Sequence, residues 1–407
     1  MKNFFDAIGM ASMEKVHSAV IGWMLSDECE ALTLSERSEL LYTLFGCKEE
    51  KEEKKWFETI RAEVEVNNID ILFITNEGKE DQACWVIENK IKSNQHSNQL
   101  DKYYNIVTGN VYTDNRGKKR KKETYRDFTP SFCFLTLVKE EPKGDYKKSW
   151  RNTLYSTLYD NLKNALDKPT QESSHYFILK EYVECLRELT EALTDFICNP
   201  GNYPQAFVDG RTSKGNKNSK DAKGKYAEYI AENNLETIFQ ECFLLYIMNN
   251  EEYFPIEARK NTTIISAGNA MFSTYVRDFP NSNLSLQIEF QAGTYKVVLI
   301  HRNYGNPKPN DYKEIYGEYK ENKWSKWYPI FEKYKNNNKN WTLEVSNNIR
   351  AKEKGNMSGS IIKPRIALDN KIDDDWYKNL AGFKDGYLEA KKIADQIFNE
   401  YENACLN

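Results

Sequence analysis

Two carboxylates and one ammonium group lie in two short apolar segments of this 407-residue chain. Asp70 lies in "IDILFIT" (69–75), and Glu88 and Lys90 lie in "ACWVIENKI" (83–91). Two carboxylates in close contact repel each other, so one takes up a proton unless a cation lies between them. Hard oxygen ligands in small number leave open positions for water and phosphate, which suits Mg²⁺ or Mn²⁺. A lysine beside them would stabilise an attacking hydroxide or a pentavalent phosphate.

Strand geometry predicts that these groups meet. Side chains alternate along a strand, so Glu88 and Lys90 share one face with Val86, and Asp70 shares a face with Leu72. The polar segment "NEGKEDQ" between the two runs favours a hairpin. If the strands pair in this way, Asp70 and Glu88 converge at the same end of the sheet.

The triplet formed by Glu88, one residue and Lys90 is not specific by itself. The same spacing recurs at 77–79, 321–323 and 389–391, and such charges are ordinary on the exposed face of an edge strand. An aspartate before an apolar run is also an ordinary turn residue. The order of the surrounding elements, with a helix after the second strand, favours a chemical role.

A helix is predicted to begin near Ser93 and to carry Gln99 and Tyr103 on one face, because they are four residues apart. The Gln99 amide could hold a phosphate oxygen or a water of a metal shell, and Tyr103 could stack or hydrogen-bond beyond it. An exposed polar stripe with Tyr103 half-buried is the alternative. Glu14, in a helix predicted to follow Ser12, could supply a third carboxylate. Its alternative role is that of a surface residue stabilised by the helix dipole.

Taken in this order, the segments resemble the PD-(D/E)XK nuclease superfamily. The resemblance rests on Glu14, on "NNIDILFI", on "VIENKI" and on "QLDKYY", which matches the QxxxY helix of the RecB-like branches. "SWRNTLYSTL" and "ILKEYVECLREL" are similar to the helical continuation of a stand-alone bacterial group. The resemblance covers about residues 10–195.

The resemblance implies an α/β, restriction-endonuclease-like core, with a mixed four-stranded sheet flanked by helices. Asp70 and Glu88 would be metal ligands, with Glu14 assisting and Asn89 placing its backbone carbonyl near the ion. Lys90 would position or activate the water.

Gln99 would orient that water or contact the metal shell. Cleavage would leave a 5′-phosphate and a 3′-hydroxyl. Asn67 and Asn68 depart from related sequences, which often carry Gly or Arg just before the aspartate.

The residues and the resemblance together predict a nuclease that depends on Mg²⁺ or Mn²⁺, with DNA as the expected nucleic acid. The resemblance implies restriction, repair or phage defence as its setting, without a choice among the three. A non-catalytic nucleic-acid-binding or regulatory protein on the same scaffold is the alternative, and a pure interaction module is a third. Besides nucleic acid, the expected partner is a second copy of the chain or a member of a defence system.

Basic residues concentrate in "RGKKRKK", which has six positive charges in seven residues: Arg116, Lys118, Lys119, Arg120, Lys121 and Lys122. One hypothesis is that they clamp the nucleic-acid backbone and release counterions on binding. An alternative with equal support is that the segment is only the solvent-exposed tip of a hairpin. "KWSKWYPIFEKY" (323–334) could stack single-stranded bases, although core packing is favoured.

Composition limits the classes of protein. The net charge of −4 gives no general nucleic-acid footprint, so a polyanion must be held by a local patch or a metal. Eight cysteines without a CxxC pair favour reduced thiols over a disulfide framework or a zinc site. No apolar stretch approaches the roughly 20 residues that span a bilayer, and no signal peptide is expected, which predicts a cytoplasmic protein without membrane contact.

The order of elements predicts two domains. Residues 1–200 read as an α/β layer that turns helical from Trp150 to Phe196. Residues 201–225, poor in apolar side chains, predict a flexible linker or loop. Residues 226–407, with a hairpin turning at 292–293, predict a C-terminal α+β domain that selects substrate, senses a signal or assembles the protein.

Overall fold

The computed structural model divides into two compact units, Met1–Cys198 with Lys223–Cys242 and Asn199–Ala222 with Phe243–Asn407. Arg116 and residues 208–223 of the expected linker lie outside the described part of the chain. The described residues are 2–47, 56–91, 98–114, 117–167, 173–207, 224–267, 269–279, 284–301, 317, 319–320, 323–345, 366–371 and 376–406.

A mixed five-stranded sheet forms the centre of the first unit. Its spatial order is β1-β2-β3-β6-β7, with β1, β2 and β3 antiparallel and β3, β6 and β7 parallel. The strands are β1 (Ile60–Val66), β2 (Ile69–Thr75), β3 (Ala83–Lys90), β6 (Thr129–Thr136) and β7 (Trp150–Leu154). The hairpin of β2 and β3 is the one that the sequence predicts.

Strand β7 corrects one expectation. The pattern from Trp150 onward predicts a helix, whereas this segment is a strand and α5 (Tyr155–Leu166) begins only after it. Parallel pairing decides the outcome, because Trp150 lies opposite Phe132 of β6 with ring centroids 5.0 Å apart. The sheet therefore has one strand more than the four that the resemblance implies.

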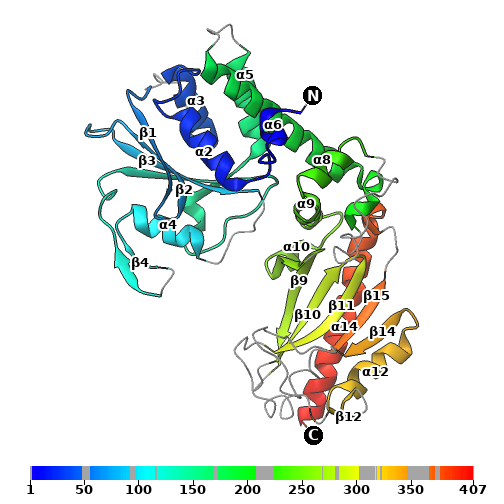
Figure 1. Cartoon of the computed structure of the whole chain (residues 1–407). Helices are drawn as coiled ribbons and strands as arrows, with labels where there is room; N and C mark the ends of the chain where they lie inside the picture. Colours follow the sequence, from blue (N-terminus) through cyan, green and yellow to red (C-terminus); the bar gives the residue numbers. More distant parts are fainter. Residues whose placement is uncertain are drawn as a thin grey trace. The chain divides into compact units, whose positions relative to one another are not determined.

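Helices cover both faces of this sheet (Figure 1). One face packs against α2 (Glu14–Leu25) and α3 (Leu34–Phe45), and α5 packs against α6 (Ser174–Cys198). Trp85 of β3 points to this face, where its ring lies 5.1 Å from that of Phe45.

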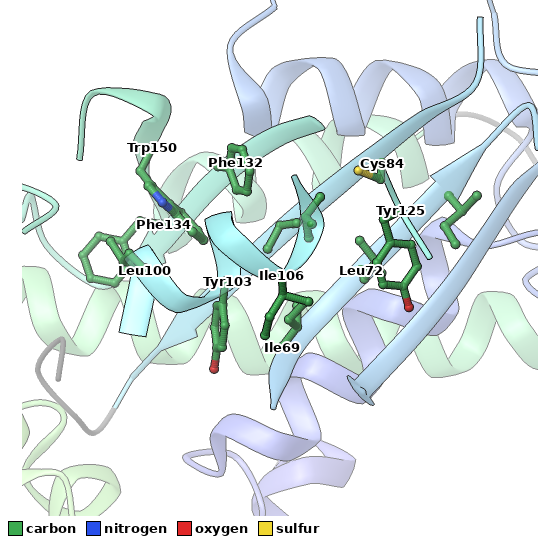
Figure 2. Packing of buried hydrophobic residues seen from close by; sticks show 13 residues of the cluster. Ile69, Leu72, Cys84, Leu100, Tyr103, Ile106, Tyr125, Phe132, Phe134 and Trp150 are labelled. Carbon is green, nitrogen blue, oxygen red and sulfur yellow. The ribbon is translucent and has the colours of Figure 1, made fainter. Parts of the chain in front are cut away.

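The other face of the sheet carries α4 (Gln99–Val107). Val86 of β3 points to this face and lies in a buried cluster with Leu100 and Tyr103 of α4. Figure 2 shows these two residues of α4 within the cluster. Neighbouring strand residues thus point to opposite layers, as alternation requires. A hairpin of β4 (Val111–Thr113) and β5 (Lys119–Lys121) follows α4.

Residues beyond the expected linker divide between the two units. α8 (Ala227–Glu232) and the first part of α9 (Glu236–Asn249) lie in the first unit. Phe239 of α9 packs there against Phe196 of α6, with ring centroids 5.6 Å apart. The sequence pattern places all of 226–407 in one domain, but the chain up to Cys242 belongs to the first unit.

The second unit is built on an antiparallel six-stranded sheet of order β14-β15-β11-β10-β9-β8. β10 and β11 form the predicted hairpin, with Ala292 and Gly293 in the left-handed conformation of a tight turn. Trp327 and Phe331 are buried, which agrees with core packing of their segment. The strands are β8 (Thr262–Ala267), β9 (Asn269–Asp278), β10 (Leu284–Gln291), β11 (Thr294–His301), β14 (Trp341–Val345) and β15 (Ile366–Lys371), and a small hairpin pairs β12 (Tyr319–Lys320) with β13 (Lys323–Trp324).

Helices accompany this sheet, and α14 packs against β10 and β11. Shorter 3-10 turns, η2 (Pro200–Asn202) and η3 (Pro204–Phe207), belong to the same unit. In the portion that the structure describes, no helix has both the length and the low charge needed to cross a bilayer. The helices are α10 (Ile256–Arg259), α12 (Tyr328–Asn337) and α14 (Ala381–Leu406).

Candidate active site

Asp70 and Glu88 lie where β2 and β3 separate. The antiparallel pairing ends at Ile71 opposite Ile87, one residue before the two carboxylates, so that both leave the sheet on the same face. Beyond this point the backbone N–H of Asn89 donates to Asp70 Oδ2 over 2.8 Å. The Asp70 carboxylate thus accepts the hydrogen bond that a backbone carbonyl of β2 would accept if the strand pairing continued.

Glu88 is a buried carboxylate with one ionic neighbour. Its side chain has no exposed surface, and Oε1 lies 2.6 Å from Nζ of Lys90. That contact lacks the directional geometry of a hydrogen bond, and neither oxygen of Glu88 accepts one from any residue in the described ranges. Lys90 is itself 8% exposed. A fully buried carboxylate with a single ionic neighbour is costly, which indicates that this group serves a ligand.

Burial dominates the electrostatics of the cluster. It raises the pKa of Glu88 to about 8, and the Asp70 carboxylate adds to the increase. Burial also raises the pKa of Asp70 to about 6, against the opposing effects of Lys90 and of the Asn89 N–H. For Lys90, burial lowers the pKa, but Glu88 and Asp70 outweigh it and leave the pKa raised.

These residues fit a divalent cation. The Lys90 ammonium acts on both carboxylates but contacts only Glu88. The Glu88 oxygens accept no hydrogen bond of good geometry from the described residues, and the buried Oε1 of Gln99 has no partner among them. A cation such as Mg²⁺ or Mn²⁺ takes oxygen ligands of this kind. Across the described ranges, no group of three or more His, Cys, Asp or Glu side chains is arranged to hold a metal ion. The cluster around Lys90 offers two carboxylates, Asp70 and Glu88.

Glu14, expected to assist, lies at the end of β3. It is the first residue of α2, and its Oε1 accepts a hydrogen bond from the Ile91 N–H over 2.8 Å. Its negative charge acts on Asp70 and Glu88 and raises the pKa of each. One oxygen of Glu14 thus fixes the backbone that follows Lys90.

The Asn89 side chain has partners that the sequence reasoning did not anticipate. Its Nδ2 donates to the Glu14 carbonyl and to Ser18 Oγ, each over 3.0 Å. Its Oδ1 accepts from the Tyr155 hydroxyl over 2.5 Å. Alternation places Asn89 on the apolar face with Ile87, and an amide in that position requires hydrogen-bond partners, which is the signal that could have found them.

Gln99 and Tyr103 are joined by a hydrogen bond within α4. Gln99 Nε2 donates to the Tyr103 hydroxyl over 2.8 Å, and that hydroxyl donates to the Asn68 carbonyl. The Tyr103 ring is 2% exposed and packs in the core, with its oxygen directed out of the cluster (Figure 2). Its burial excludes stacking of a base on this ring.

Asn67 and Asn68 form the turn between β1 and β2. Both have positive φ angles, 59° and 63°, a conformation that Asn tolerates better than most residues. The turn holds Tyr103 through the Asn68 carbonyl. The two asparagines thus have a structural role: both adopt the positive φ of the turn, and the main chain of Asn68 holds Tyr103.

A cleft of about 810 Å³ lies over the cluster. Its lining includes Glu14 of α2, Asp70 of β2, and Gln99 and Lys102 of α4. Strand β4 supplies a further part of the wall through Val111–Thr113. Asp70, Glu14 and Gln99 thus open into a space whose wall includes β4, the partner strand of the basic β5.

The predicted basic segment is partly neutralised by its own neighbours. Arg120 pairs with Asp114 over 3.1 Å, and Lys121 pairs with Glu123 over 2.6 Å. Lys122 lies over the Tyr125 ring. Exposed Lys118 and Lys119 make no ion pair with residues that the structure describes.

Comparison with known proteins assigns a class to this fold and site. Residues 2–195 match the model of the PD-(D/E)XK nuclease superfamily, and we assign this region to that superfamily. The match confirms the predicted restriction-endonuclease-like fold. Nucleases of this class act on nucleic acid and generally use divalent metal ions. No curated protein and no solved structure matches the chain.

Proposed function

We propose that this protein is a deoxyribonuclease that hydrolyses phosphodiester bonds with Mg²⁺ or Mn²⁺ held by Asp70 and Glu88. The observation that supports this most strongly is the fully buried Glu88, whose oxygens accept no hydrogen bond from the described residues. A bound cation would satisfy these oxygens, polarise the phosphate and make water a better nucleophile at neutral pH.

The other residues act around this pair. The Lys90 ammonium is fixed beside Glu88 at 2.6 Å and stabilises negative charge on the phosphate or orients the water. Gln99 commits its Nε2 to Tyr103, so its Oε1 is the atom that orients the water. Glu14 holds the Ile91 N–H, and the Asn89 carbonyl completes the proposed ligand set.

The cleft wall supports the choice of nucleic acid as substrate. Lys118 and Lys119 belong to the hairpin whose other strand lines the cleft. Exposed lysines that are not committed to nearby carboxylates can contact phosphates and release counterions. We assign Lys118, Lys119, Arg120, Lys121 and Lys122 to contacts with the nucleic-acid backbone, and Arg116 remains a sequence-based member of that group.

Cleavage of plasmid and single-stranded DNA with Mg²⁺ or Mn²⁺ tests this function. Glu88→Ala and Lys90→Ala should abolish cleavage, because each removes a charge from the buried cluster. Glu77→Ala and Lys79→Ala are matched controls, since they alter the same spacing in the exposed turn after β2, and both should retain activity. Metal-dependent cleavage that survives Glu88→Ala would refute the assignment, and binding without cleavage by the wild type would favour the non-catalytic alternative.

A further inference from the structure

We propose that the side chain of Asn89 is a positioning residue of the active site. It joins the first turn of α2 and Tyr155 of α5 to the end of β3, and so sets where the cation-binding carboxylates lie. The catalytic consequence of this inference rests on the proposed function, whereas its geometry rests on hydrogen bonds of the protein alone.

Every polar atom of the Asn89 side chain is used. The residue has no exposed surface. Nδ2 has two hydrogens and donates one to the Glu14 carbonyl and one to Ser18 Oγ, while Oδ1 accepts from Tyr155. A leucine could fill a similar volume, but it would remove the hydrogen bonds that Asn89 makes with the Glu14 carbonyl, Ser18 Oγ and the Tyr155 hydroxyl. The amide therefore contributes direction as well as packing.

Backbone N–H groups at and after Asn89 bind the side chains of Asp70 and Glu14. Its N–H donates to Asp70 Oδ2, and the N–H of Ile91 donates to Glu14 Oε1, each over 2.8 Å. The Asn89 side chain binds the backbone of Glu14, and the Glu14 side chain binds the backbone two residues after Asn89. These two hydrogen bonds join Glu14 to the residues on both sides of Lys90 and fix the backbone of the lysine between them. Displacement of the end of β3 would therefore move Lys90, Asp70 and Glu14 together. Displacements near 1 Å of catalytic groups lower enzymatic rates steeply.

Tyr155 fixes the outer end of this arrangement. It is fully buried, and its ring lies edge-on to that of His17, with centroids 5.5 Å apart. His17 is held in turn by Tyr182 of α6, whose hydroxyl lies 3.0 Å from Nδ1. The two buried tyrosines differ in one respect: the Tyr155 hydroxyl contacts Asn89, and the Tyr182 hydroxyl contacts His17.

This difference defines the experiment. Tyr155→Phe removes the hydrogen bond to Asn89, and Tyr182→Phe removes an equally buried hydroxyl that does not contact Asn89. Calorimetric titration of the full chain with Mn²⁺ should show about tenfold weaker binding for Tyr155→Phe, as for other residues that orient metal ligands. Tyr182→Phe should change the affinity less than twofold, although both variants should unfold at lower temperature.

A second measurement needs no metal. Hydrogen exchange of the Asn89 and Ile91 amides in the metal-free protein should accelerate in Tyr155→Phe but not in Tyr182→Phe. Ser18→Ala, a milder change that removes one acceptor of Nδ2, should act in the same direction and serves if Tyr155→Phe does not fold. Equal effects of the two tyrosine variants on exchange, or no effect of Tyr155→Phe or Ser18→Ala, would overturn the proposal. A wild type that binds no Mn²⁺ would instead contradict the proposed function, while the exchange result still tests the role of Asn89.

Discussion

Glu88 combines full burial with one ion pair, to Lys90, and its burial makes the site sensitive to pH. Its folded-state pKa is raised from 4.5 to about 8, chiefly by burial. The folded state therefore binds a proton that the unfolded state has released. Stability from this group is present below the unfolded pKa and is lost as pH rises through the folded pKa.

The metal-free protein should consequently lose thermal stability between about pH 5 and pH 8, where Glu88 and Asp70 lose their protons. Glu88→Gln cannot ionise, so its melting temperature should fall less over this range and exceed that of the wild type at pH 8. Thermal unfolding in a chelator checks this, and added Mn²⁺ should restore the wild type alone. Parallel pH profiles for the two proteins would contradict the assignment of the pKa to Glu88.

Gln99 and Tyr103 should separate catalysis from stability. Gln99→Ala removes the buried Oε1 and should lower kcat by roughly 10–100-fold with little change in KM. Tyr103→Phe removes the contact with the Asn68 carbonyl and should lower the free energy of unfolding by about 1 kcal/mol. Steady-state cleavage and denaturant unfolding of both variants distinguish the two effects; equal losses of kcat would contradict the separate roles.

The positions of some site residues could be predicted from the sequence, whereas the role of Asn89 could not. The placement of Asp70, Glu88 and Lys90 on one face follows from alternation within two short strands. The side-chain role of Asn89 depends on Ser18 and Tyr155, which lie 71 and 66 positions away along the chain. No local pattern reports such contacts, because they arise only when three elements pack together.

At the scale of elements, the β4–β5 hairpin should contribute to the salt dependence of DNA binding. Lys118→Ser with Lys119→Ser removes two exposed charges and should reduce the slope of log K against log salt by about 1–2. Lys163→Ser with Lys180→Ser is a control of equal charge on the helices α5 and α6. An unchanged slope for the hairpin variant, or equal changes in both, would rule out a hairpin contact with phosphates.

The connection between β6 and β7 depends on a close approach to α4. Asp101 accepts from the N–H groups of Asp145 and Tyr146 over 3.1 and 3.0 Å. Gly144 has φ 122°, and a Cβ there would lie 2.5 Å from both Asp101 oxygens. A side chain at this position would therefore displace the Asp101 carboxylate or the loop, and the positive φ favours glycine.

Gly144→Ala should lower the free energy of unfolding by about 2–3 kcal/mol, because it combines backbone strain with the loss of these hydrogen bonds. Gly78→Ala, at φ 83° with open space around it, should cost only about 1 kcal/mol. Denaturant unfolding compares the two, and equal losses would show that the contact with Asp101 contributes nothing.

Elements with strong local signals were predictable, and β7 was not. The β2–β3 hairpin and the helix bearing Gln99 follow from apolar runs and turn residues. Trp150, Leu154, Tyr155 and Leu158 are also compatible with a helical period, so this segment reads as helix. Its strand state is decided by parallel pairing with β6, a contact that local spacing does not encode.

At the scale of the whole molecule, the first unit extends beyond the matched region. Asn233 donates from Nδ2 to Asp6 over 3.3 Å, and its carbonyl accepts from Ser12 over 3.1 Å. Phe239 covers Phe196. These contacts add the segment 223–242 to the first unit.

A fragment that ends at residue 198 should therefore be less stable than one that ends at residue 242. The shorter fragment uncovers Phe196 and breaks the contacts of Asn233, which should lower its melting temperature by several degrees and promote aggregation. Thermal unfolding and size-exclusion chromatography of both fragments compare them. Identical melting temperatures would show that this segment does not stabilise the first unit.

The negative charge of the protein explains why a bound cation would matter for binding of a polyanion such as DNA. The chain carries a charge of −4, and acidic side chains line the cleft that DNA would enter. The most direct test is the anomalous signal of crystals soaked in Mn²⁺. We predict one peak within coordination distance of both Asp70 and Glu88; its absence there, in crystals of protein that cleaves DNA with Mn²⁺, would contradict the account.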